Sequence, residues 1–154
     1  MNKKKRRLFG KKYLPEYLKE LNTLTNIEVT PQELISIEKS DLINTIKHDV
    51  SKNIMLNFND KEKLLILIGR LINIKNGPSY LYTTYAKDCG LLKLNSINDF
   101  NINFNFTDEH AGFIKFILQD LSNEISLDFY EEDGEQLLEI EISGNEWCQI
   151  EIDH

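Results

Sequence analysis

The sequence predicts an α+β fold in which N-terminal helices precede a mostly antiparallel sheet and the C-terminal part forms a β-α-β-β-β unit. Three observations support this fold class. Apolar residues alternate strictly on both sides of an Asp-Gly pair within residues 124–143. They recur with helical spacing in the first half of the chain. A capping box at residues 30–33 marks the start of one of those helices.

The charge of the chain is divided between its two ends. The formal net charge is −7 over 154 residues. Residues 1–12 contain seven Lys and Arg, whereas residues 116–154 contain twelve acidic residues and no Lys or Arg. We expect residues 1–12 to form a disordered basic arm and residues 13–154 to form a single domain. The arm is either a solvated tail that aids solubility or a contact for nucleic acid.

Three helices are expected ahead of the sheet. Leucines and a tyrosine fall on one face of residues 13–24. The capping box, with proline at the first helical position, predicts a helix over residues 31–47, in which Ser40 and Asp41 mark a candidate break. Residues 63–73 are apolar on nearly every side, which predicts a helix buried at the centre of the core.

Strands and one further helix complete the expected pattern. Residues 54–58 are a short apolar segment that fits either element type. The aromatic residues of 79–86 and the leucines of 91–94 predict short strands. Within residues 99–106, Phe and Ile alternate with Asn, which is typical of a half-buried strand. A wide apolar stripe predicts a crossover helix over residues 108–121.

The Asp133-Gly134 pair predicts a tight hairpin and fixes its register. Both residues tolerate the positive φ angles of a type I′ two-residue loop. A slip of one residue would turn the apolar set out to water, so only one register is expected. The predicted cross-strand pairs are Phe129–Leu138, Leu127–Ile140 and Ile125–Ile142 on the apolar face, and Tyr130–Leu137, Asp128–Glu139 and Ser126–Glu141 on the polar face.

A third strand is expected over residues 147–152, and its register depends on the turn that precedes it. A two-residue turn at Gly144 would place Ile150 on the polar face. A three-residue turn keeps Cys148 and Ile150 inside and sets Glu151 beside Glu139 on the polar face, so we favour it.

The polar face of this sheet gathers acidic and aromatic side chains. Like charges directly opposite each other cost about 0.2–1 kcal/mol per pair, so a purely structural sheet would favour neutral residues there. The face is therefore either solvated or a surface that binds a partner. The candidate partner-binding residues are Asp128, Tyr130, Glu139, Glu141, Trp147 and Glu151.

Motifs for catalysis, cofactors and metals are not found. The chain has no P-loop, no Rossmann glycine pattern and no GxSxG. The sequential residues Asp108, Glu109 and His110 do not share a helix face, so they are a poor metal site. Cys89 and Cys148 are interpreted as free thiols. We therefore expect no enzymatic activity, no cofactor and no metal.

The cellular setting is expected to be the cytoplasm of a bacterium. No stretch of about 18 apolar residues is present, and the apolar part of the basic N-terminus is too short for a signal peptide. Asn, Ile and Lys number 16, 19 and 15, which indicates an AT-rich, low-GC genome.

The acidic C-terminal third resembles the immunity proteins that protect bacteria against polymorphic, contact-dependent toxins. The resemblance is one of layout and not of a shared motif, and it rests on Asp128, Tyr130, Glu139, Glu141, Trp147 and Glu151. It implies a protein that binds and blocks a cognate cationic toxin, often a nuclease, without catalysis. The alternative is a nucleic-acid- or ribosome-associated accessory protein that acts through residues 1–12.

Overall fold

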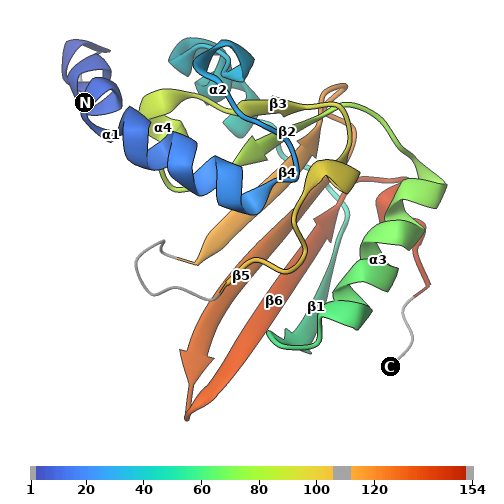
Figure 1. The fold of residues 1–154 in the computed structure, drawn as a ribbon. Helices are drawn as coiled ribbons and strands as arrows, with labels where there is room; N and C mark the ends of the chain where they lie inside the picture. Colours follow the sequence, from blue (N-terminus) through green and yellow to red (C-terminus); the bar gives the residue numbers. More distant parts are fainter. Residues whose placement is uncertain (1–2, 106–111, 152–154) are drawn as a thin grey trace.

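A six-stranded antiparallel sheet organises the protein. The computed structural model describes residues 3–105 and 112–151, and it confirms the α+β class. The described strands follow the order β1-β6-β5-β4-β2-β3 across the sheet (Figure 1). Their bounds are β1 (Ser51–Asn57), β2 (Ser79–Tyr82), β3 (Leu92–Leu94), β4 (Phe113–Leu118), β5 (Glu124–Glu132) and β6 (Glu135–Ser143).

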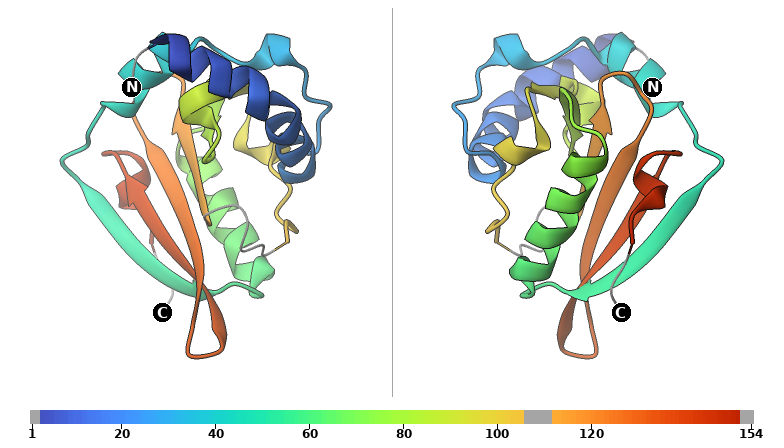
Figure 2. Two further views of the ribbon diagram at one scale, coloured as in Figure 1. Left: turned by 90° about the vertical axis from the view of Figure 1, so that its left-hand side faces the viewer. Right: turned by 90° about the vertical axis from the view of Figure 1, so that its right-hand side faces the viewer.

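The helices lie in two places around this sheet. The α-helices are α1 (Lys3–Leu24), α2 (Ile37–Asn44), α3 (Lys61–Ile74) and α4 (Ala86–Cys89), and the short 3-10 helices are η1 (Pro31–Glu33), η2 (Ile97–Asp99) and η4 (Trp147–Gln149). Helices α1, α2 and α4 gather at one end of the sheet, whereas α3 packs on one face near β1 (Figures 1 and 2). We call the face that α3 covers the inner face, and the opposite one the outer face.

Aromatic rings fill the middle of the inner face. The ring of Phe129 on β5 lies 5.7 Å from Phe58 and 5.4 Å from Phe104, measured between centroids. Phe100 lies 5.0 Å from Phe116 on β4. All five side chains are buried. Aromatic pairs of this kind stabilise a fold by about 0.5–1.5 kcal/mol each beyond the area they bury, so the rings tie the sheet to the segments that cover it.

The hairpin of β5 and β6 confirms the predicted loop and register. Asp133 and Gly134 have φ angles of 52° and 81°, as a type I′ loop requires. The observed partners are Ile125–Ile142, Leu127–Ile140 and Phe129–Leu138 on the inner face, and Ser126–Glu141, Asp128–Glu139 and Tyr130–Leu137 on the outer face. Turn chemistry and alternation are thus sufficient to define this unit.

The predicted strand and helix ahead of the hairpin are wrong. Residues 97–99 form η2, and the chain then runs irregularly with Phe100 and Phe104 turned inward. The segment assigned to a crossover helix contains strand β4, while residues 106–111 lie outside the described part of the chain. β4 is apolar at every position except Lys115, so its nearly continuous apolar run resembles a helical stripe.

The predicted third strand of the C-terminal unit is also wrong. Residues 147–149 form η4, and β1 instead occupies the position beside β6. The backbone N–H of Trp147 donates to Asn123 Oδ1 at 2.9 Å, and its indole N–H donates to the Lys75 carbonyl at 3.0 Å. These two bonds draw Trp147 into the core, so the chain turns over the inner face after Gly144 and does not add a strand.

The N-terminal segment is helical where a disordered arm was predicted. α1 begins at Lys3 and includes most of the basic residues. Two contacts hold this part of the helix. The Arg6 guanidinium donates to both carboxylate oxygens of Asp41, at 2.6 and 2.9 Å, and the Phe9 ring stacks on Tyr13 with centroids 6.1 Å apart.

Two further helix predictions need correction. The helix expected over residues 31–47 is divided into η1 and α2 after Glu33, and α2 spans the candidate break at Ser40 and Asp41. Helix α3 is present but is not buried on all sides. Leu65 and Ile66 are 58% and 48% exposed, because α3 packs only one face against the sheet.

Candidate partner-binding face

Four of the six predicted binding residues come together on the outer face of the β5–β6 hairpin. Asp128 lies opposite Glu139, and Glu141 is one step along β6 on the same face. Tyr130 follows Asp128 on β5. Strand alternation places all four on one surface, because residues two apart point to the same side of a sheet.

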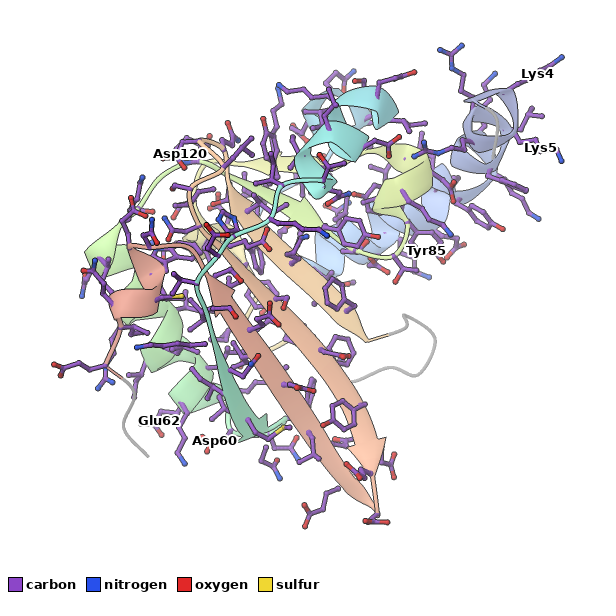
Figure 3. All side chains as sticks on the ribbon, turned by 180° about the vertical axis from the view of Figure 1, so that it is seen from behind. Lys4, Lys5, Asp60, Glu62, Tyr85 and Asp120 are labelled. Atoms are coloured by element: carbon purple, nitrogen blue, oxygen red, sulfur yellow. The ribbon has the colours of Figure 1, made fainter. Side chains whose placement is uncertain are left out.

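The acidic surface extends to the tip of the hairpin. Glu132 and Glu135 lie opposite each other beside the turn, and both are exposed. The tip projects beyond the rest of the sheet (Figure 1; seen from behind in Figure 3). We define the acidic face as the outer-face carboxylates of Asp128, Glu132, Glu135, Glu139 and Glu141.

The acidic face lacks cationic partners within the chain. Among the residues that the structure describes, no Lys or Arg forms an ion pair with any of its five carboxylates. Lys115 of β4 lies on the same face, but its Nζ lies 3.8 Å from Glu124 and 5.9 Å from the centre of the Tyr82 ring. Like-charged neighbours such as Asp128 and Glu139 therefore stay uncompensated, which costs stability rather than adding it.

Tyr130 is an aromatic side chain set among these carboxylates. It is half-buried, and its hydroxyl lies 3.9 Å from the sulfur of Met55 on β1. Desolvation raises the pKa of Tyr130, and the nearby charges of Glu139 and Glu132 raise it further. The phenol thus stays neutral and offers a hydroxyl and a ring to a partner.

Two aromatic residues that sequence reasoning missed extend this surface. Phe113 of β4 lies opposite Asp128, and its ring meets Tyr82 edge to face with centroids 6.1 Å apart. Both side chains are half-buried. Phe113 was assigned to a helix, so its place on the outer face was hidden. Apart from Lys115, the residues of 113–118 are all apolar, so the sequence offered no alternation that would have placed Phe113 on a strand.

The other two predicted binding residues lie elsewhere, which corrects their predicted placement. Trp147 is fully buried beneath the inner face and presents no surface to a partner. Glu151 is exposed, but its carbonyl accepts a hydrogen bond from Arg70 on α3, at 3.1 Å. It is not beside Glu139, whose neighbour on that side is Met55 of β1.

A pocket of about 430 Å³ opens between α1 and the ends of β2 and β4. Its walls include the buried side chains of Glu20 and Thr83 and the apolar side chain of Ile114. Its described lining offers one carboxylate, from Glu20, and no thiol, imidazole or ammonium group. That set does not contain a nucleophile paired with a base.

The two thiols are suppressed as nucleophiles. Burial raises the pKa of Cys89 to about 11, and burial also raises the pKa of Cys148. A thiol is reactive as the thiolate, so both groups are weak nucleophiles near neutral pH. Among residues 3–105 and 112–151, no three or more His, Cys, Asp and Glu side chains cluster as metal ligands would.

Comparisons of the chain with protein-family models, with curated proteins and with solved structures each found no match. Within the described residues, no helix combines the length and the apolar character that crossing a membrane requires.

Proposed function

We propose that the protein is a non-catalytic binding module whose acidic face engages a cationic protein. The most specific form of this proposal is a cytoplasmic immunity protein that neutralises a nuclease-like toxin. The observation that carries it is the set of five carboxylates on a projecting hairpin with no compensating cation among the described residues.

The proposed mechanism is occlusion. A nuclease site is cationic because it holds phosphates, and a row of carboxylates mimics that polyanion. Electrostatic attraction raises the association rate above the roughly 10⁵–10⁶ M⁻¹s⁻¹ of uncharged partners. The projecting tip, with Glu132 and Glu135, has the shape to enter a cleft, while Tyr130 and Phe113 supply the aromatic contacts that usually dominate binding energy.

The energetics of the free protein favour a binding role over a structural one. The pair of Asp128 and Glu139, like that of Glu132 and Glu135, places like charges opposite each other. Each pair costs about 0.2–1 kcal/mol in the isolated protein. When a cationic partner binds, this repulsion is replaced by attraction, because the partner neutralises both carboxylates at once.

The experiment compares two variants of equal charge. Glu139→Gln with Glu141→Gln removes two carboxylates from the acidic face. Glu16→Gln with Glu28→Gln removes two exposed carboxylates elsewhere. Binding is measured by stopped-flow at two salt concentrations, against a basic nuclease-like protein sought first among the products of the adjacent genes. We expect the first variant to associate about tenfold more slowly, with a flatter salt dependence, and the second to match the unmodified protein.

The contradicting outcomes are equally specific. If both double variants associate at the same rate, the acidic face contributes only net charge. If no adjacent gene encodes a basic protein that binds this chain and whose toxicity in cells the chain suppresses, the immunity role is excluded.

A second candidate function is supported by the basic half of α1. The side chains of Lys4, Lys5, Lys11 and Lys12 are exposed. Figure 3 shows Lys4 and Lys5 far from the hairpin tip, at the opposite end of the molecule. A helix with this charge fits the phosphate backbone of nucleic acid. Replacing the four lysines by Gln should then abolish salt-dependent retention on heparin, and no retention by the unmodified protein would exclude this function.

A further inference from the structure

Asn76 and Gly77 form a chemically distinctive pair in the connection between α3 and β2 (Figure 1). Asn76 is the one asparagine in the sequence that a glycine follows. Glycine has no Cβ, so the residue after Asn76 does not hinder the approach of its own backbone nitrogen to the side-chain amide. Attack of that nitrogen on the amide carbon closes a five-membered succinimide ring, which is the first step of deamidation. The pair is therefore a candidate site of covalent modification.

The reacting atoms lie close together in the folded chain. The backbone N–H of Gly77 donates to Asn76 Oδ1 at 2.8 Å. Cγ of Asn76 is bonded to this oxygen at about 1.23 Å, so the nitrogen lies within about 4 Å of the carbon that it attacks. Reacting atoms in a near-attack arrangement are about 3–3.5 Å apart, so a modest rotation of the side chain completes the approach. The fold thus holds the pair near the geometry of ring closure.

Ser96 supplies a hydrogen-bond donor to the same amide oxygen. It precedes η2, and its hydroxyl donates to Asn76 Oδ1 at 3.3 Å. The hydroxyl oxygen in turn accepts from the N–H of Asn98 at 3.2 Å, which fixes its position and leaves its hydrogen for Asn76. Negative charge develops on Oδ1 when the nitrogen attacks, and a positioned donor stabilises an oxyanion of this kind. Ser96 therefore assists the reaction at the oxygen that becomes charged.

The pair also lies outside the protection of helical hydrogen bonds. Asn76 is exposed and Gly77 is half-buried. Helix α3 ends at Ile74 and Lys75 is its C-cap, so the N–H of Gly77 is not part of the helix. Asn73 is a contrast within the same chain, because it is exposed but lies in the last turn of α3, ahead of the branched Ile74. Helical bonding and the branched neighbour both oppose ring closure at Asn73.

Glycine at position 77 is required neither by packing nor by the backbone. Apart from its two chain neighbours, no described atom lies within 4 Å of where a Cβ would be. Its φ angle is not in the left-handed region either. Gly77→Ala should therefore fold normally while placing a methyl group beside the attacking nitrogen.

We propose that Asn76 is a site of spontaneous deamidation in the folded protein, assisted by Ser96. The nitrogen of Gly77 loses its proton to hydroxide and forms a bond to Cγ of Asn76. The bond from Cγ to Nδ2 then breaks, and Nδ2 takes a proton from water and leaves as ammonia, which restores the hydroxide.

Hydrolysis of the ring completes the reaction. Water adds to one of the two ring carbonyls and breaks its bond to the Gly77 nitrogen, which gives either aspartate or isoaspartate. The proton of the new carboxylic acid passes to ammonia. Water is the co-reactant throughout, and no group is oxidised or reduced.

The product differs in charge and in backbone at a point where the fold is anchored. Deamidation adds one negative charge beside Lys75, whose Nζ lies 2.8 Å from Asp120 and 3.6 Å from Glu146. The isoaspartate form also adds a methylene group to the main chain just after Lys75, whose carbonyl accepts the indole N–H of buried Trp147. This inference goes beyond the proposed binding function and does not rest on it.

The first test follows peptide masses and ammonia release while the full-length protein is kept at physiological temperature and mildly alkaline pH. Asn76 should convert at least about tenfold faster than Asn73. Gly77→Ala should slow this conversion at least about tenfold, because its methyl group hinders the nitrogen. Gly69→Ala is the matched control, since the Cβ position of Gly69 on α3 is equally open, and it should leave the rate unchanged. Equal rates at the two asparagines, or equal effects of the two variants, overturn the proposal.

The second test compares the folded protein with the same full-length chain unfolded in guanidinium chloride. The folded protein should convert Asn76 at least as fast as the unfolded chain, because the fold holds the nitrogen close to the amide. A folded rate more than about tenfold below the unfolded rate would mean that native structure protects Asn76, and it overturns the proposal.

The role of Ser96 is tested by two substitutions. Ser96→Ala removes the hydroxyl and should slow conversion of Asn76 about two- to tenfold, as expected for the loss of one hydrogen bond. Ser96→Thr keeps a hydroxyl and should restore the rate. Circular dichroism checks that both variants fold, because the Ser96 side chain also caps η2. Equal rates in the two variants overturn the role of Ser96. Should Ser96→Ala not fold, the rate of Ser96→Thr decides, and a value more than about tenfold below that of the unmodified protein overturns this role.

Discussion

The two faces of the β5–β6 hairpin are built from alternating residues of the same strands and have opposite chemistry. On the inner face, Leu127 and Ile140 are fully buried against the core. On the outer face, Asp128 and Glu139 are exposed and carry like charges. Stability is therefore concentrated on the inner face, and the outer face is free to serve recognition. This division predicts that neighbouring residues will respond to substitution in different assays.

The largest expected effect compares adjacent residues on β5. Phe129→Ala should lower the free energy of unfolding by about 3–5 kcal/mol, because it leaves a cavity among the inner-face rings. Asp128→Ala should change it by no more than about 0.5 kcal/mol. Chemical denaturation measures both. Similar losses for the two variants would show that the faces do not divide these roles.

Trp147 was predicted to contact a partner, but it is buried on the inner face, so its substitution should affect stability and not binding. Trp147→Phe should lower the free energy of unfolding by about 2 kcal/mol, since the carbonyl of Lys75 loses its buried donor. Partner binding by the folded variant should be unchanged. Faster dissociation with unchanged stability would restore Trp147 as a binding anchor.

The hairpin was predictable from sequence because its determinants are local. The Asp133-Gly134 turn and the period of two lie within twenty residues of each other and leave one register open. The capping box at Thr30 was also local, and its two halves are present, although the helix that it begins is only a single turn. Short-range signals thus identified an element's start better than its length.

The remaining errors come from contacts distant in sequence. β4 lies between β2 and β5, and its residues are apolar except for Lys115, which removes the alternation that identifies a strand. Trp147 is held by Asn123 and Lys75, which no local pattern connects to it. The candidate site was therefore predicted where it depends on the hairpin alone, and missed where β4 and β1 contribute Phe113 and Met55.

The half-buried amine of Lys61 on the inner side gives a smaller, pH-dependent effect. Lys61 Nζ lies 3.7 and 3.9 Å from the ring centres of Phe58 and Phe104. Burial lowers the pKa of Lys61 from 10.5 to about 8. Between these pH values the unfolded chain binds the proton and the folded chain does not. The free energy of unfolding therefore rises with pH across this window, and this gain is lost as the pH falls through 8.

The measurement is the difference in unfolding free energy between the unmodified protein and Lys61→Met, taken from pH 7 to 11. The difference removes the opposite contribution of Cys89, whose raised pKa lowers stability as pH rises. From pH 7 to 11 the free energy of unfolding of the unmodified protein should rise by about 1 kcal/mol relative to that of the variant. This value is reduced for solvent screening. Lys63→Met, at an exposed position of α3, is the control and should show no such trend.

The smallest expected effect lies on the outer face and has the opposite sign to the core substitutions. Glu139→Gln removes the charge opposite Asp128, so it should raise the free energy of unfolding by about 0.2–1 kcal/mol at low salt. The gain should shrink as salt is added, because mobile ions already screen exposed like charges. Glu28→Gln, at an exposed position outside the sheet, should show neither the gain nor its salt dependence. A loss of stability from Glu139→Gln would mean that the carboxylate holds the fold together, and the acidic face would then owe its charge to structure and not to recognition.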